Sequence, residues 1–264
     1  AYYQLGELNR LRGNYAQAEE AYRQSHNAGR NPQPGLALLS LAKGQVDSAK
    51  ASICRSLDEA KSPKSRTRLL PAYIEIMIVA AEITKAQSAV QELVDITGKL
   101  DAPPLLALAA QAEGSALLSQ GDPRSAVDRL SNAMTIWNSL EAPYECARVR
   151  LLIGLARTAI GDKEGANLEY EAARSMFVQL DARPDIARVD ALRQESKRGK
   201  IHGLTSRELE VLRLLATGKT NKTIADEMFV SERTIDRHVS NILSKLDLPS
   251  RAAATAFAYK YNLI

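Results

Sequence analysis

The spacing of hydrophobic residues at the carboxyl end of the chain predicts four short helices between residues 203 and 264. In the first helix, Leu209, Leu212 and Leu215 form an apolar face at helical spacing, and Gly218 ends the helix. In the third, four aliphatic residues follow one another at intervals of 4, 3 and 4 positions. This stripe consists of Ile235, Val239, Ile242 and Leu246. The pattern indicates a small helical domain with its own core.

Polar residues mark where these helices begin. Thr205 followed by Glu208 has the spacing of a capping box at the start of the first helix. Thr220 and Ser231 stand where the second and third helices need an N-cap, and Pro249–Ser250 precedes the fourth. Two short helices joined by a tight turn, the second longer and better capped, have helix-turn-helix geometry.

A different pattern repeats through residues 1–192. A small residue is followed five positions later by alanine, and four positions after that by a larger apolar residue. The pattern occurs five times, with starts 31, 37, 40 and 40 residues apart. The five sets are Gly13–Ala18–Tyr22, Gly44–Ala49–Ile53, Ala81–Ala86–Val90, Gly121–Ala126–Leu130 and Gly161–Ala166–Tyr170.

Paired antiparallel helices explain this repeat. Glycine suits the turn between two helices, alanine lets them approach closely, and the residue four positions on lies on the same face. One such pair cannot bury its own apolar face, so we expect successive pairs to stack into a superhelix. Prolines fall between the expected pairs, where helices break. They are Pro32, Pro34, Pro63, Pro103, Pro104, Pro143 and Pro184.

Aromatic residues in the repeats have two interpretations. They line a concave groove and hold a ligand, or they pack in the core and between repeats, which we prefer. The residues concerned are Tyr2, Tyr3, Tyr73, Trp137, Tyr144 and Phe177. His26 lies in a polar stretch, so we expect it to be solvated.

Charge separates the two parts of the chain. Residues 193–264 hold 13 lysines and arginines against 8 aspartates and glutamates, whereas residues 1–192 hold 22 against 23. A basic terminal module beside a near-neutral body indicates a nucleic-acid-binding domain attached to a second domain. The polar segment 193–202 is expected to be a linker or a frayed helix end between them.

Several classes of protein lack support in the sequence. Cys54 and Cys146 are far apart and outside any metal-binding motif, which favours ordinary thiols in helices and a cytosolic protein. The longest apolar runs, such as Ile76–Ala81, are far too short to cross a bilayer. We find no catalytic arrangement and no phosphate-binding glycine loop. We therefore expect no enzyme, no metal and no cofactor, with nucleotide binding only in a domain upstream of Ala1.

The third C-terminal helix has a polar outward face. On a helical wheel, Arg233, Arg237, Ser240 and Ser244 point away from the apolar stripe, with Asn241 close by. Such a face fits the major groove, where arginine forks bind guanine edges. Lys222 and Lys245 are placed for phosphates, together with the N-terminal amides of both helices.

Asp236 stands on the flank of this face, and two interpretations remain open. The carboxylate stabilises the helix N-terminus and pairs with Arg233 three residues earlier. Alternatively, it orients an arginine fork or accepts a hydrogen bond from a cytosine amino group.

The C-terminal region resembles the DNA-binding domain of the LuxR/FixJ superfamily. The residues that carry the resemblance are Leu204-Thr205, Arg207-Glu208, Glu210-Val211-Leu212, Leu215-Ala216, Gly218, Asn221-Lys222, Ile224-Ala225, Val230-Ser231, Thr234-Ile235, His238, Ile242, Lys245-Leu246, Arg251 and Ala254. The resemblance implies that Thr220 to Val239 is the core of the DNA-binding motif. It also implies that Ala252, Ala256 and Tyr259 on the last helix contact a second copy, with packing inside the domain as the alternative.

The repeats resemble the tetratricopeptide repeat, most clearly at Leu5-Gly6, Gly13, Tyr15, Ala18 and Tyr22. Both parts together resemble the C-terminal part of the large MalT-like regulators. The sequence thus predicts an all-α protein, with a tetratricopeptide-like superhelix over residues 1–192 and a four-helix LuxR-type domain over residues 203–264. The residues expected at DNA are Thr220, Asn221, Lys222, Ser231, Arg233, Thr234, Asp236, Arg237, His238, Ser240, Asn241, Ser244, Lys245 and Arg251.

These features together predict a cytoplasmic bacterial transcriptional regulator that binds double-stranded DNA as a homodimer. The repeats would receive a small-molecule or protein inducer. The alternative is an adaptor whose repeats bind a protein or peptide and whose terminal module has little or no DNA specificity.

Overall fold

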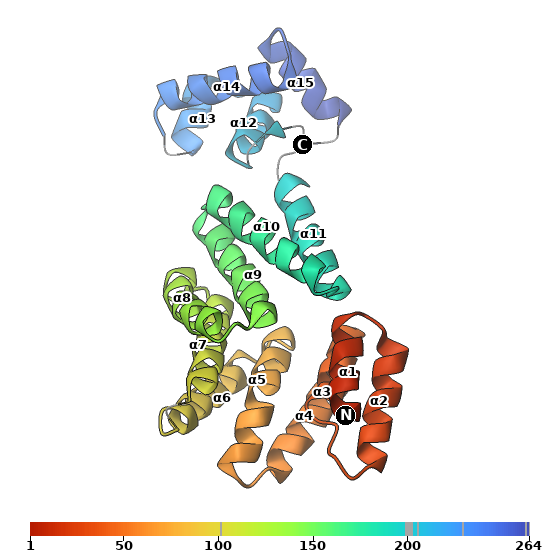
Figure 1. Cartoon of the computed structure of the whole chain (residues 1–264). Helices are drawn as coiled ribbons and strands as arrows, with labels where there is room; N and C mark the ends of the chain where they lie inside the picture. Colours follow the sequence, from red (N-terminus) through yellow and green to blue (C-terminus); the bar gives the residue numbers. More distant parts are fainter. Residues whose placement is uncertain (101, 199–202, 205, 229, 262, 264) are drawn as a thin grey trace. The chain divides into compact units, whose positions relative to one another are not determined.

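The computed structural model is all-α. It describes residues 1–100, 102–198, 203–204, 206–228, 230–261 and 263, and these residues form fifteen helices and no strand (Figure 1). The chain divides into two compact units, residues 1–190 and residues 191–264. The predicted fold class is confirmed.

The first unit consists of helices that follow one another in antiparallel pairs. They are α1 (Tyr2–Leu11), α2 (Tyr15–Asn27), α3 (Gly35–Ala42), α4 (Val46–Glu59), α5 (Pro63–Val79), α6 (Ile83–Thr97), α7 (Pro103–Ser119), α8 (Pro123–Ser139), α9 (Pro143–Ile160), α10 (Lys163–Gln179) and α11 (Arg183–Arg198). The boundary between the units falls within α11. Residues 193–198 of the expected linker are therefore helical, and residues 199–202 lie outside the described residues.

The repeat detected in the sequence marks the turn inside each helix pair. The first residue of each set occupies the turn with a left-handed backbone, as at Gly161 (φ 94°), and Ala81 adopts it without being glycine (φ 57°). The alanine and the larger residue that follow are at most 9% exposed in all five sets. Odd-numbered helices also pack against the next odd-numbered helix, as α5 does with α7 and α7 with α9. The helix pairs therefore stack, as the repeat predicted.

Close helix contacts explain two further glycines. A Cβ atom on Gly6 would lie 2.6 Å from the ring of Tyr22, and one on Gly154 would lie 2.5 Å from the ring of Tyr170. Both tyrosines are the third residue of a repeat set and are almost completely buried. The missing side chain on one helix thus makes room for the ring of its partner helix.

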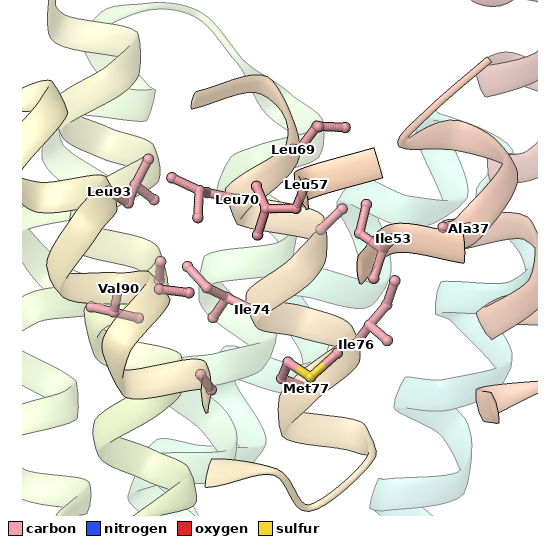
Figure 2. Packing of buried hydrophobic residues seen from close by; sticks show 14 of the residues in the cluster. Ala37, Ile53, Leu57, Leu69, Leu70, Ile74, Ile76, Met77, Val90 and Leu93 are labelled. Atoms are coloured by element: carbon pink, nitrogen blue, oxygen red, sulfur yellow. The ribbon is translucent and has the colours of Figure 1, made fainter. Parts of the chain in front are cut away.

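The largest core of the first unit lies between α3 and α7. Figure 2 shows Ile74 of α5 on the side that faces Leu93 of α6, whereas Ile53 of α4 lies on the opposite side of α5, and each is at most 2% exposed. Partly buried Tyr73 packs against this core. Aliphatic side chains from neighbouring pairs share one core, as expected where single pairs do not bury their own faces.

Two of the residues considered for a ligand groove belong to the core. Trp137 is 6% exposed, and its indole N–H donates to Oε1 of Gln111 over 2.9 Å, while Phe177 is completely buried. The groove interpretation is therefore wrong for these two residues, because neighbouring helices cover both rings. Tyr2 is exposed, and Tyr3 and Tyr144 are half-buried. His26 is exposed, as predicted.

The second unit contains the four helices that the sequence predicts. They are α12 (Ser206–Ala216), α13 (Asn221–Glu227), α14 (Glu232–Leu246) and α15 (Arg251–Lys260). Leu212 of α12, Ile224 of α13, Ile235 and Ile242 of α14 and Ala258 of α15 meet in one core, and each is completely buried. All four helices thus contribute to a core of their own.

Candidate nucleic-acid interface

Helices α13 and α14 form a capped helix-turn-helix. Oγ1 of Thr220 accepts a hydrogen bond from the amide of Thr223, and Oγ of Ser231 accepts one from the amide of Thr234, each over 3.2 Å. Both predicted N-caps are confirmed. Thr205, which the sequence placed in the first cap, lies outside the described residues. The caps fix where α14 begins and so which of its side chains point outward.

Helix α14 has one buried and one exposed side. Ile235 and Ile242 are completely buried, and Val239 and Leu246 are half-buried against the same core. The opposite side is exposed and hydrophilic, as the wheel predicts. Its exposed residues are Arg233, Arg237, Ser240, Asn241 and Ser244.

The two outward arginines are available for a ligand. Among the residues that the structure describes, the side chains of Arg233 and Arg237 form neither a hydrogen bond nor an ion pair. Lys222 of α13 is exposed and equally unengaged in that part of the chain. An arginine presents several donors in a planar fork, which matches the two acceptors of a guanine edge or the oxygens of a phosphate. The exposed side of α14 is therefore chemically suited to a polyanion with acceptor-rich edges.

Asp236 has a partner that the sequence did not predict. Its Oδ1 accepts a hydrogen bond from Nδ2 of Asn221 over 2.6 Å, and Oδ1 of Asn221 accepts one from Nη1 of Arg251 over 2.6 Å. Arg251 also donates from Nη2 to the carbonyl of Lys219. The expected pair of Asp236 with Arg233 is not formed. Three residues predicted at DNA are thus joined to one another across α13, α14 and α15.

Lys245 also has an internal partner. Its Nζ lies 2.7 Å from both carboxylate oxygens of Glu208 on α12, whose side chain is only 4% exposed. A buried carboxylate needs such a partner, since burial without one is costly. The ion pair joins α12 to α14, and the phosphate contact of Lys245 stays a prediction.

Replacing Lys245 by alanine is expected to destabilise the second unit by about 1–3 kcal/mol, because the buried Glu208 carboxylate then loses the ammonium group that balances its charge. Hydrogen exchange of α12 and α14 in the full chain measures this. The double variant Lys245→Met with Glu208→Gln should recover most of the loss, because no buried charge remains. If Lys245→Ala abolished DNA binding while the hydrogen exchange of α12 and α14 stayed unchanged, the lysine would act at DNA instead.

The remaining predicted residues lie at the start of α14, within it and on α15. His238 is half-buried on α14, and the hydroxyl of Thr234 lies 2.7 Å from that of Ser231. On α15, Ala252, Ala256 and Tyr259 are exposed, and Tyr259 is 64% exposed. An exposed tyrosine beside two small residues leaves this helix open to a further contact.

A second polar cluster lies on the odd-numbered helices of the first unit. The hydroxyl of Tyr144 on α9 donates to Oδ2 of Asp185 on α11 over 3.1 Å. One turn further along α9, Arg148 binds Glu75 of α5 over 2.8 Å and Glu145 over 3.3 Å. Ion pairs thus connect helices that are far apart in the sequence, which sequence spacing alone did not indicate.

Burial raises the pKa of Asp185, and the hydrogen bond from Tyr144 with the nearby charges of Arg148, Arg188 and Arg10 only partly opposes this. A raised folded-state pKa means that the protonated form is favoured. Its contribution to stability is therefore present below the ordinary pKa and is lost as the pH rises through the raised value. At neutral pH, the Asp185 carboxylate lowers the free energy of unfolding.

Replacing Asp185 by asparagine is accordingly expected to raise the melting temperature at pH 7. At pH values below the ordinary pKa of aspartate the gain should shrink, since the wild-type carboxyl is then neutral too. Thermal unfolding of both full-length proteins over this range measures the difference. An equal rise in melting temperature at both ends of the pH range, or a lower melting temperature at pH 7, would contradict the raised pKa of Asp185.

Other kinds of site find no support in the described part of the chain. It contains no group of three or more histidine, cysteine, aspartate or glutamate residues that could hold a metal ion. Its cysteines are free thiols, half-buried at Cys54 and buried at Cys146. None of its helices combines the length and the apolar character that a membrane span requires.

The C-terminal unit is thus a helix-turn-helix module with an exposed cationic helix. Residues 202–258 match the family described as "Bacterial regulatory proteins, luxR family". This part of the chain is therefore a helix-turn-helix domain of the LuxR family, as the resemblance implied. Similarity of the first unit to a named repeat family stays a prediction.

Known proteins share the same segment. The chain is 48% identical over 69 residues to the "Uncharacterized transcriptional regulatory protein YhcZ" of Bacillus subtilis, which is 26% of this chain and 32% of that protein. It is 49% identical over 61 residues to the "Transcriptional regulatory protein LiaR" of the same organism, which is 23% of this chain and 29% of that protein. It is 47% identical over 62 residues to the "Nitrate/nitrite response regulator protein homolog" of Haemophilus influenzae, covering 24% and 30%. The match thus spans about a third of each relative.

Proposed function

We propose that this protein is a bacterial transcriptional regulator that binds DNA sequence-specifically through α14. The observation that carries the proposal is the exposed side of this helix, where Arg233 and Arg237 stand without a protein partner among the described residues. Buried Ile235 and Ile242 hold the opposite side to the core. The match of residues 202–258 to a family of regulatory proteins supports the same function. Such a regulator would act in the cytoplasm, where bacterial DNA lies.

Selection of bound duplexes from a random DNA library tests this function. The full chain, at physiological salt, should enrich one sequence over the library because α14 reads base edges in the major groove. An enriched pair of half-sites about 10 bp apart would support a homodimer that pairs through Ala252, Ala256 and Tyr259 of α15. Binding without any enriched sequence would favour the alternative function, an adaptor without DNA specificity.

We further propose that the first unit receives the signal, as a small molecule or a protein. The polar cluster around Tyr144, Arg148 and Asp185 supports this, because it gathers charged and hydrogen-bonding groups where burial disfavours the charged form of Asp185. A ligand that binds there should protect α9 and α11 from hydrogen exchange in the full chain. If a ligand of the regulator left the hydrogen exchange of α9 and α11 unchanged, its binding site would lie elsewhere.

A further inference from the structure

We propose that Asp236, Asn221 and Arg251 form a positioning relay that holds α14 against α13, so that Asp236 affects DNA recognition without contacting a base. The inference rests on the proposed DNA-binding function. It concerns the acidic residue on the flank of the exposed arginine face. On a surface that binds a polyanion, a carboxylate without a hydrogen-bond partner would be unfavourable.

The relay connects the three helices that surround the candidate interface. It runs from Asp236 on α14 to Asn221, the first residue of α13, and on to Arg251, the first residue of α15. Both hydrogen bonds of the amide are 2.6 Å long. The second arm of the Arg251 guanidinium donates to the carbonyl of Lys219, in the turn before α13. The relay therefore ties the position of α14 to the start of α13.

The chemistry of the three groups allows only one arrangement of the amide. An arginine only donates hydrogen bonds, and an ionised aspartate only accepts them. The Asn221 amide between them must turn its NH₂ group toward Asp236 and its oxygen toward Arg251. Both bonds involve a charged partner, which makes them stronger and more directional than bonds between neutral groups.

The relay also bears on Arg233, which stands three residues before Asp236 and would be its usual partner in a helix. Because the Asn221 amide engages Asp236 instead, Arg233 stays available for DNA. Arg251 balances the carboxylate, so that the relay as a whole carries no net charge.

The effect of the relay is expected in the geometry of binding more than in global stability. Asp236 is exposed and Asn221 and Arg251 are half-buried, and exposed polar pairs stabilise a fold only slightly. A small rotation of α14, however, displaces every outward side chain together. Base-edge contacts depend on that geometry, whereas phosphate attraction depends mainly on charge.

Exchanging the two partners tests the relay. Asn221→Asp alone places two carboxylates against each other and should reduce the preference for the selected DNA site over an unrelated duplex by about tenfold or more. Asp236→Asn alone keeps a hydrogen bond between two amides and should leave the preferred sequence unchanged. The double variant has the net charge of the wild type and restores both bonds, since the carboxylate now on α13 accepts from Arg251 and from the new amide on α14. It should recover the preference.

Two outcomes would overturn the proposal. One is a double variant as impaired as Asn221→Asp. The other is a changed base preference in Asp236→Asn, which would show that the carboxylate reads a base.

Hydrogen exchange of the full chain without DNA provides a separate measurement. Residues 221–227 should exchange faster in Asn221→Asp and return to the wild-type rate in the double variant. Unchanged exchange in Asn221→Asp would overturn the relay. If the wild-type protein itself shows no sequence preference, the proposed function fails, whereas the exchange measurement still decides on the relay.

Discussion

Replacing Arg237 by alanine is expected to weaken binding to the preferred DNA site by about 1–3 kcal/mol, roughly 5- to 150-fold. The side chain is exposed on the outward side of α14 and has no partner in the described part of the chain. Its removal should therefore leave the fold intact and remove a bidentate contact with a guanine edge. Fluorescence anisotropy with the preferred site and with a duplex changed at single positions measures both affinity and preference.

Arg124→Ala is the matched control for this variant. Arg124 is an exposed arginine of α8 in the first unit, so that its loss changes the net charge equally. The affinity of Arg124→Ala for DNA should change little, and its preference for the selected site should not change. If Arg237→Ala weakened all duplexes uniformly, the arginine would contact a phosphate instead of a base.

Replacing Ile242 by alanine is expected to destabilise the second unit by about 2–5 kcal/mol. Ile242 is completely buried where α14 meets the core of the second unit, so the shorter side chain leaves a cavity there. Because a chain with two units need not unfold in one step, hydrogen exchange of peptides from α14 reports the effect better than a single melting curve. Binding of the preferred DNA site should fall with the loss of protection.

Leu168→Ala is the control for Ile242→Ala. Leu168 lies on α10 and is 68% exposed, so that removing a similar aliphatic side chain should change stability within about 0.5 kcal/mol. Equal effects of the two variants would mean that α14 does not depend on its buried stripe.

Local patterns predicted most of the fold. The repeat of a small residue, alanine and a larger apolar residue identified each helix pair, because turns and close helix contacts impose those residue types. The N-caps Thr220 and Ser231 were also predictable, since a cap acts within three residues. Proline was a weaker guide, because Pro71 lies inside the 17-residue helix α5.

Partners that are distant in the sequence could not be predicted. The helical wheel does not show that Glu208, 37 residues before Lys245, lies within reach of its amine. It places Asp236 on the flank of α14, whereas its bond to Asn221 depends on how α13 packs against α14. Trp137 and Phe177 are buried by other helices, which periodicity alone does not show. Spacing therefore gives the direction of a side chain, and packing gives its partner.

Sequence-specific binding is tested by the ratio of two dissociation constants for the full chain. One is measured with the sequence that selection enriches, and the other with a scrambled duplex of the same length, both at physiological salt. A regulator that reads base edges with α14 should bind the enriched sequence more tightly by roughly a thousandfold or more. A ratio near one, with binding that merely weakens as salt increases, would contradict sequence-specific recognition.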